Sequence, residues 1–116
     1  MKRTQIKRRR SAKVINFAAE LDAITPALVA RSGGQCELQI SHQCLGLATN
    51  RHHRQNRSQG GTNELVNILH LCGSGTTGCH GFVTNNPNVA EANGWTVRSH
   101  IDPATVPVVS RVTKQP

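Results

Sequence analysis

The chain has 116 residues, a length that accommodates one ordinary domain and excludes a multidomain enzyme or a Rossmann-type cofactor domain. Its 14 lysines and arginines outnumber its 6 acidic residues, and the net charge of +8 favours a polyanionic partner. Only 36% of the residues are hydrophobic and 3% are aromatic, so we expect a stabilising element besides an apolar core. No run approaches the roughly 18 apolar residues of a membrane-spanning helix, and no apolar signal-peptide segment follows the basic start, which predicts a cytoplasmic protein.

The first segment of the chain is strongly basic, with seven of the 14 lysines and arginines in the first 13 positions. We predict that residues 1–15 form a disordered, flexible arm, because a run of like charges repels itself. The arm is either a solubilising tail or a phosphate-binding segment, and its candidate DNA-binding residues are Arg8, Arg9 and Arg10. An ordered domain is expected over residues 16–112, followed by a frayed tail over residues 113–116.

Capping and turn signals divide the remaining chain into short helices and strands. Thr25 and Pro26 are typical of a helix start, with threonine as the cap and proline in the first turn, and Gly33-Gly34 would end this helix. A polar loop closed by Gly60-Gly61 separates the first two expected strands. The expected elements, in order, are a helix over 25–31, strands over 47–54 and 67–72, helices from 79 and from 86, and strands over 95–98 and 106–112.

The four cysteines form two pairs, Cys36/Cys44 and Cys72/Cys79, with seven and six intervening residues. A structural zinc site needs four soft ligands, which two loops from separate parts of a chain usually supply. We therefore predict that the cysteines bind a structural Zn²⁺, which compensates for the small apolar core. Two alternatives stay open from the sequence: reduced free cysteines within a core, or disulfides in an exported protein.

Two adjacent histidines, His52 and His53, lie in the first expected strand. Neighbouring strand residues point to opposite sides, so one imidazole can bind a metal ion while the other accepts a proton. Two exposed surface histidines are the alternative interpretation. His80 favours the first interpretation, because it directly follows the presumed zinc ligand Cys79 and is therefore rigidly placed. The histidines that we interpret as structural or surface residues are His42, His70 and His100, and Trp95 is interpreted as a core residue.

These features occur in a characteristic order. The chain runs from His-His-Arg at residues 52–54, through the Gly-Gly-x-Asn loop at 60–63 and Asn67 before an apolar strand, to Cys79-His80. In this order they resemble the HNH endonuclease family. The segment Leu-Cys-Gly-Ser-Gly-Thr-Thr-Gly-Cys-His is most similar to its small phage-type members. The resemblance covers about residues 26–98.

The resemblance implies an α+β fold: a small, zinc-stabilised ββα-metal (His-Me finger) domain with flanking helices. His53 matches the general base that deprotonates water, while His52 and His80 match ligands of a catalytic divalent ion such as Mg²⁺, Mn²⁺ or Ni²⁺. Asn67 matches the middle asparagine, which braces the loop between the strands and orients the base. The four cysteines match the zinc knuckle that some members carry.

A neutral His53 can act as a base when an acceptor holds its other ring nitrogen. We expect this acceptor to be the Asn67 side chain or a main-chain carbonyl. Basic side chains beside the histidines are expected to contact DNA phosphates. These are Arg51, Arg54 and Arg57.

One position departs from the family pattern. Many members carry a third metal ligand one helical turn after the last histidine, where this chain has Thr84. Threonine is a weak ligand, so the third ligand is Thr84, Asn85 or water.

The sequence thus predicts a divalent-metal-dependent DNA endonuclease that hydrolyses phosphodiester bonds by nicking or double-strand cutting. The resemblance further implies a phage-encoded enzyme in the host cytoplasm, acting on DNA and with a terminase or other packaging protein, without a membrane or small-molecule partner. One alternative is a non-catalytic zinc-knuckle protein that binds nucleic acid, which leaves the histidines and Asn67 without a role. A purely structural adaptor would also leave the charge unexplained.

Overall fold

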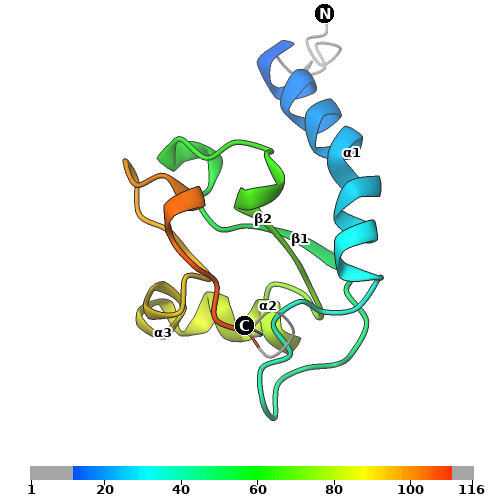
Figure 1. Ribbon diagram of the computed structural model, residues 1–116, viewed down its shortest axis with the longest axis vertical. Coiled ribbons are helices and arrows are strands. Elements are labelled where there is room, and N and C mark those ends of the chain that lie inside the picture. The colour runs from blue at the N-terminus through cyan, green and yellow to red at the C-terminus, as the bar shows by residue number, and fades with distance from the viewer. Residues whose placement is uncertain (1–11, 111–116) are drawn as a thin grey trace, which may run out of the picture.

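The computed structural model describes residues 12–110, and their side chains from residue 17 onward. It is a small α+β fold with a two-stranded sheet (Figure 1). Its helices are α1 (Ala12–Ser32), α2 (Gly78–Asn85) and α3 (Pro87–Ala92), its strands are β1 (Asn50–His53) and β2 (Ile68–Leu71), and its 3₁₀ helices are η2 (Arg57–Gln59), η3 (Leu65–Asn67) and η4 (Pro103–Thr105). None of the helices within residues 12–110 is long and apolar enough to cross a bilayer.

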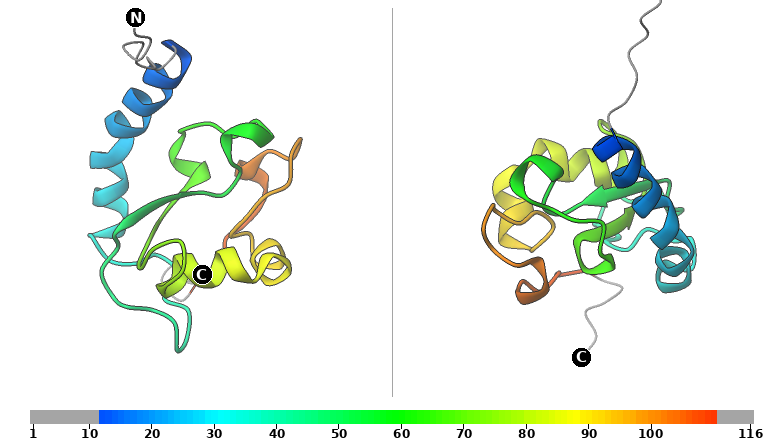
Figure 2. Two further views of the ribbon diagram at one scale, coloured as in Figure 1. Left: turned by 180° about the vertical axis from the view of Figure 1, so that it is seen from behind. Right: turned by 90° about the horizontal axis from the view of Figure 1, so that it is seen from above.

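The two strands pair antiparallel, with Asn50 opposite Leu71 and His53 opposite Ile68. They lie between α1 and the pair formed by α2 and α3 (Figures 1 and 2). Both strands fall within the ranges expected from the sequence, and α2 and α3 begin within one residue of their expected starts. The sheet therefore places the two adjacent histidines of β1 in the middle of the fold.

The first helix is much longer than predicted. Thr25 and Pro26 do not start α1, which begins at Ala12 and contains Pro26 in its interior. Proline has no N–H to donate within the helix, but the turn before it is held from outside. Arg51 of β1 donates from Nη1 to Asp22 Oδ1 at 2.9 Å and to Thr25 Oγ1 at 3.0 Å. The helix ends as predicted, at a glycine with positive φ (Gly33, 67°).

The start of α1 lies inside the segment that we predicted as a flexible arm of residues 1–15. Ala12 and the three residues after it are helical. The rest of that segment, with Arg8, Arg9 and Arg10, lies outside the described residues, as does most of the predicted tail.

The predicted strands over residues 95–98 and 106–112 are not formed in the described part of the chain. Part of this region is held instead by the buried side chain of Arg54, which is only 2% exposed. Its guanidinium donates to four main-chain carbonyls, one of which, that of Val106, lies in a predicted strand. These acceptors are Gly94 O (2.8 Å), Val66 O (2.8 Å), Pro103 O (3.1 Å) and Val106 O (2.6 Å). The Arg54 side chain thus holds the C-terminal segment by hydrogen bonds, whereas a sheet would hold it by pairing with another strand.

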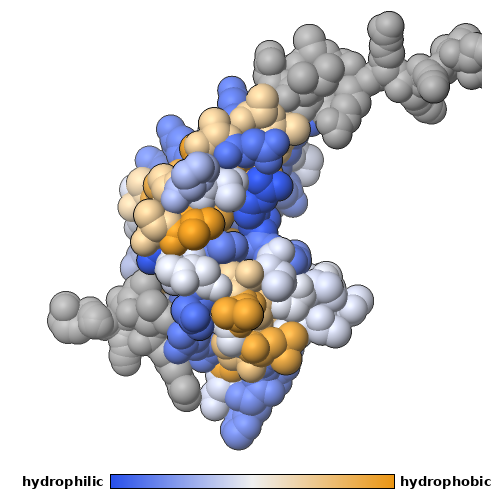
Figure 3. All heavy atoms as spheres, turned by 90° about the vertical axis from the view of Figure 1, so that its right-hand side faces the viewer, coloured by the Kyte–Doolittle hydropathy of each residue, from blue (hydrophilic) through white to orange (hydrophobic). Residues whose placement is uncertain are grey.

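The apolar core is small and includes three of the four cysteines. Cys36, Cys72 and Cys79 are fully buried and pack with residues from β2, α2, α3 and the loop after α1. Trp95 belongs to this core, as predicted, and its ring meets Phe82 edge to face at 6.3 Å. Several large apolar side chains stay exposed, among them Val29, Leu45 and Leu47, and Figure 3 shows apolar side chains scattered among polar ones on the face that carries α1.

The role of Arg54 can be tested by replacing it with methionine, which keeps the length of the side chain but removes all of its donors. We expect Arg54→Met to lower the free energy of unfolding by more than about 3 kcal/mol, because buried carbonyls lose charged partners. Urea unfolding followed by the fluorescence of Trp95 measures this change. Arg98→Met is the matched control, because the Arg98 side chain is 72% exposed and should cost at most about 1 kcal/mol. Equal losses in the two variants would contradict this role.

Candidate functional site

The four cysteines form one compact cluster. Their Sγ atoms all lie within 4.8 Å of one another, and the Sγ atoms of Cys44 and Cys72 are 3.9 Å apart. Four sulfur ligands at about 2.3 Å from a zinc ion are about 3.8 Å apart in a tetrahedron. All four cysteines are free thiols, which removes the disulfide alternative. The cluster can therefore hold a structural metal ion such as zinc, as the sequence predicted.

Main-chain N–H groups surround the sulfur atoms. Cys72 Sγ accepts from the amides of Leu45 and Cys79 at 3.2 Å each, and Cys79 Sγ accepts from the amide of Ile40 at 3.3 Å. A hydrogen bond from Cys79 lowers the pKa of the Cys36 thiol and raises the pKa of Cys79 itself. The main-chain N–H donors stabilise the thiolate form, in which cysteine binds metal.

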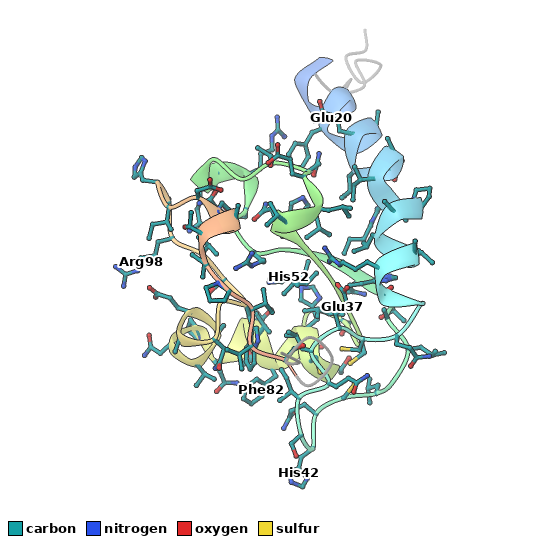
Figure 4. All side chains as sticks on the ribbon, viewed as in Figure 1. Glu20, Glu37, His42, His52, Phe82 and Arg98 are labelled. Carbon is teal, nitrogen blue, oxygen red and sulfur yellow. The ribbon has the colours of Figure 1, made fainter. Side chains whose placement is uncertain are left out.

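His42 lies between two of the cysteines in the sequence but is not part of the cluster. His42 stands at the exposed tip of the loop between Cys36 and Cys44 and points away from the sulfur atoms (Figure 4). Its interpretation as a surface residue is confirmed. His70 was predicted to be structural, and its Nδ1 lies 2.7 Å from Ser32 Oγ, which agrees with that prediction.

His52 and His80 face each other in the interior, with ring centroids 5.3 Å apart. His52 lies near the centre of the molecule (Figure 4), and its Nε2 is 2.8 Å from the carbonyl oxygen of Trp95. A carbonyl only accepts, so Nε2 carries the proton and Nδ1 keeps its lone pair. Burial lowers the pKa of His52 to about 4, with a smaller contribution from nearby positive charge. The ring is therefore neutral at physiological pH, which is the form that binds a cation.

His80 is held in the same way by Asn50, at the other end of β1. Its Nδ1 is 2.7 Å from Asn50 Oδ1, while Asn50 Nδ2 donates to the carbonyl of Gly73 at 3.0 Å. The asparagine amide is thus oriented with its oxygen toward His80, whose Nδ1 must be protonated. Burial lowers the pKa of His80 as well. Each of the two rings consequently has one unprotonated nitrogen, the form of imidazole that can bind a metal ion.

A cleft of about 340 Å³ opens beside His52, and His80 does not line it. Its lining includes His52, His53, Thr84, Glu91 and Arg98. Thr84, considered as a third ligand, donates its hydroxyl to the carbonyl of His80 at 3.1 Å and keeps oxygen lone pairs. A larger hollow of about 640 Å³ lies between η2, η3 and the loop before η4, but His52 and His53 do not line it. We therefore assign the candidate site to the smaller cleft.

The side chain that holds His53 is not the one expected. Its Nε2 lies 2.8 Å from Asn63 Oδ1, so neither Asn67 nor a main-chain carbonyl contacts it directly. Asn63 Nδ2 in turn donates to the carbonyl of Phe17 in α1 at 2.7 Å. The ring of Phe17 stacks on the His53 ring, with centroids 5.5 Å apart and planes 23° apart. His53 thus lies between the polar loop and α1.

Asn67 braces the loop between the strands, as the family resemblance implied. It is fully buried, its Oδ1 accepts from the amide of Gln55, and its Nδ2 donates to the carbonyls of Gln55 and Thr62, each at 2.8 Å. The loop is closed so tightly that a Cβ on Gly61 would lie 1.7 Å from the Gln55 carbonyl oxygen. Because Thr62 directly precedes Asn63, this bracing also places the residue that contacts His53.

The three arginines predicted to contact DNA have different environments. Arg54 is corrected from a phosphate-binding residue to a structural one, since its guanidinium is buried against four carbonyls. Arg51 is partly exposed and paired with Asp22. The Arg57 guanidinium lies over the ring of Phe17, the residue that stacks on His53, at 5.0 Å from the ring centroid. The sequence analysis missed Arg98, which lines the cleft, extends outward from the molecule (Figure 4) and donates to Glu91 at 2.5 Å.

Asn50, Asn63 and Phe17 were also missed as parts of the site. Asn63 was visible in the Gly-Gly-x-Asn pattern, but no role could be attached to it. Asn50 and Phe17 gave no local signal, because each acts on a residue at least 30 positions away.

Fold and site together define a small α+β protein with a four-cysteine cluster that can hold a metal ion. Comparisons of the chain with family models, with curated proteins and with solved structures give no match. The HNH resemblance stays a prediction from the residues.

The cysteine cluster predicts a protein that contains about one zinc ion per chain and needs it to fold. We expect Cys72→Ser to lose this zinc, measured by elemental analysis of the purified protein, and to lose its cooperative thermal transition in circular dichroism. Ser41→Ala, an exposed change in the same loop, should keep both. A Cys72→Ser protein with wild-type zinc content, or a zinc-free one with a wild-type melting curve, would count against a structural metal site.

Proposed function

We propose that this protein is a divalent-metal-dependent endonuclease of the HNH type that hydrolyses DNA phosphodiester bonds. The observation that carries the proposal is a cleft lined by both His52 and His53, with the ring of His80 facing that of His52. Each ring has one nitrogen held by an acceptor and one left unprotonated. Two such nitrogens suit a divalent ion, and the third suits a general base.

The chemistry follows from these roles. His53 removes a proton from a water molecule, the water oxygen attacks phosphorus, and the bond to the 3′ oxygen breaks, leaving a 5′ phosphate and a 3′ hydroxyl once the leaving oxygen takes a proton from solvent. The proton on His53 then passes to solvent. His52 and His80 would hold the divalent ion, which would stabilise the negative charge that develops on the phosphate. Asn67 keeps the loop in place, so that the base is positioned before substrate binds.

Two arginines are candidates for phosphate contacts. The Arg57 guanidinium lies over the ring of Phe17, which stacks on His53, and Arg98 lines the cleft and is strongly exposed. Arg98 donates from Nε to Glu91, which leaves its two terminal nitrogens for a phosphate. The net charge of +8 favours binding of the same polyanion.

The proposal is tested by nicking of supercoiled plasmid with Mg²⁺, Mn²⁺ or Ni²⁺. We expect the wild-type protein to convert plasmid to open-circle or linear forms, and EDTA to stop the reaction. His53→Ala should reduce the rate at least about 100-fold, because the general base is lost. Its DNA affinity and zinc content should be unchanged.

His42→Ala is the matched control, since His42 is exposed and points away from the cleft. It should cleave at the wild-type rate. Cleavage by His53→Ala at the wild-type rate, or cleavage in the presence of EDTA, would contradict the mechanism. Tight DNA binding without any cleavage by the wild type would instead indicate a zinc-knuckle protein that only binds nucleic acid.

The basic N-terminal segment predicts a second, separable effect. Deleting residues 2–11 removes six lysines and arginines but leaves α1 intact from Ala12. We expect weaker DNA binding and a slope of log K against log salt that is shallower by up to about 5, because fewer counterions are released. The cleavage rate at saturating DNA should be retained. A salt slope equal to that of the full chain would show that the segment does not contact phosphates.

A further inference from the structure

The contacts around His53 form a short relay that starts in α1. The carbonyl oxygen of Phe17 accepts from Asn63 Nδ2 at 2.7 Å, and Asn63 Oδ1 lies 2.8 Å from His53 Nε2. Asn63 is only 6% exposed, so water does not compete freely for either contact. The residues are far apart in sequence, and only the fold brings them together.

The orientation of the Asn63 amide is determined by its partners. A carbonyl oxygen can only accept, so the group of Asn63 that faces Phe17 must be the NH₂ group. The oxygen of Asn63 therefore faces His53 and must receive a proton from Nε2. In the neutral ring this leaves the lone pair on Nδ1.

We propose that Asn63, anchored by the Phe17 carbonyl, is the positioning residue that holds the proton of His53 on Nε2 and thereby makes Nδ1 the atom that accepts the proton from water. The inference rests on the proposed function for its catalytic meaning. It assigns to α1 a direct part in the active site, because the anchor of the relay is a main-chain group of that helix.

The surroundings make the relay rigid. Asn67 holds the carbonyl of Thr62, the residue before Asn63, so the main chain at this point cannot shift freely. Phe17 contributes its ring as well as its carbonyl, and the ring covers one face of the imidazole. Rotation of His53 would therefore break the hydrogen bond and lose the stacking contact together.

The test combines a spectroscopic and a kinetic measurement on the full chain containing zinc. In the wild type we expect a His53 Nε2–H proton that is protected from solvent exchange and visible in proton-detected nitrogen spectra of histidine-labelled protein, with His53→Ala assigning the resonance. Asn63→Ala removes the acceptor, so this resonance should disappear into exchange with water. The same variant should lower kcat for plasmid nicking by about 10- to 100-fold with little change in KM.

Asn63→Asp tests the relay without changing the size of the side chain. Its carboxylate still accepts from Nε2, so the protected proton should persist, and kcat should exceed that of Asn63→Ala. It cannot donate to the Phe17 carbonyl while ionised, so kcat should stay below the wild type. The matched control is Asn93→Ala, since Asn93 likewise donates from Nδ2 to a helical carbonyl, that of Val89, but lies outside the cleft. It should behave as the wild type.

The outcomes separate the two proposals. An Asn63→Ala protein that is folded, keeps the protected proton and cleaves with the wild-type kcat overturns the inference and leaves the proposed function standing. If Asn63→Ala does not fold, an Asn63→Asp protein without the protected proton overturns the inference on its own. A wild type that shows the protected proton but does not cut DNA supports the hydrogen-bond relay. The same result overturns the proposed function, and with it the catalytic role of the relay.

Discussion

The fold depends first on the cluster of four sulfur atoms. It joins the loop after α1, which supplies Cys36 and Cys44, to the end of β2 and the start of α2, which supply Cys72 and Cys79. Three of these cysteines belong to the apolar core itself, so the metal-binding cluster and the core are continuous. In a chain with so few large apolar residues, a bound ion would add the binding free energy that burial alone does not provide.

Buried polar groups complete what the small core cannot do. Arg54 bonds to four carbonyls from three segments, and Asn67 satisfies both main-chain groups of Gln55 as well as the carbonyl of Thr62. Among the described residues, no buried side-chain nitrogen or oxygen lacks a hydrogen-bond partner. Hydrogen bonds in such a network offset the free-energy cost of removing its polar groups from water only when every group has a partner. A fully bonded network then specifies a single arrangement of the loops. The loops that surround the candidate site are thus ordered by the side chains of Arg54, which follows β1, and of Asn67 in η3.

The parts of the fold that the sequence predicted are those with local signals. The two strands, α2, α3 and the cysteine cluster follow from alternation, caps and spacing, and so does the pairing of adjacent histidines with a third one after Cys79. The missed parts depend on contacts across the chain. Pro26 lies within a helix whose preceding turn is contacted by Arg51 from another element, and the carbonyl of Val106, in an expected strand, accepts from Arg54. A local pattern carries no information about such partners.

The three histidines of the candidate site are held by the same kind of hydrogen bond. Each has one nitrogen against an oxygen acceptor, namely the carbonyl of Trp95 for His52, the Asn63 amide for His53 and the Asn50 amide for His80. An acceptor on one nitrogen puts the lone pair on the other, so the fold determines which nitrogen of each neutral ring is left unprotonated. None of these acceptors is a carboxylate, and the one acidic residue that lines the cleft, Glu91, is paired with Arg98. Neutral imidazole ligands suit Ni²⁺ better than Mg²⁺ or Mn²⁺, which prefer oxygen, so the donor set itself bears on which ion supports the proposed reaction.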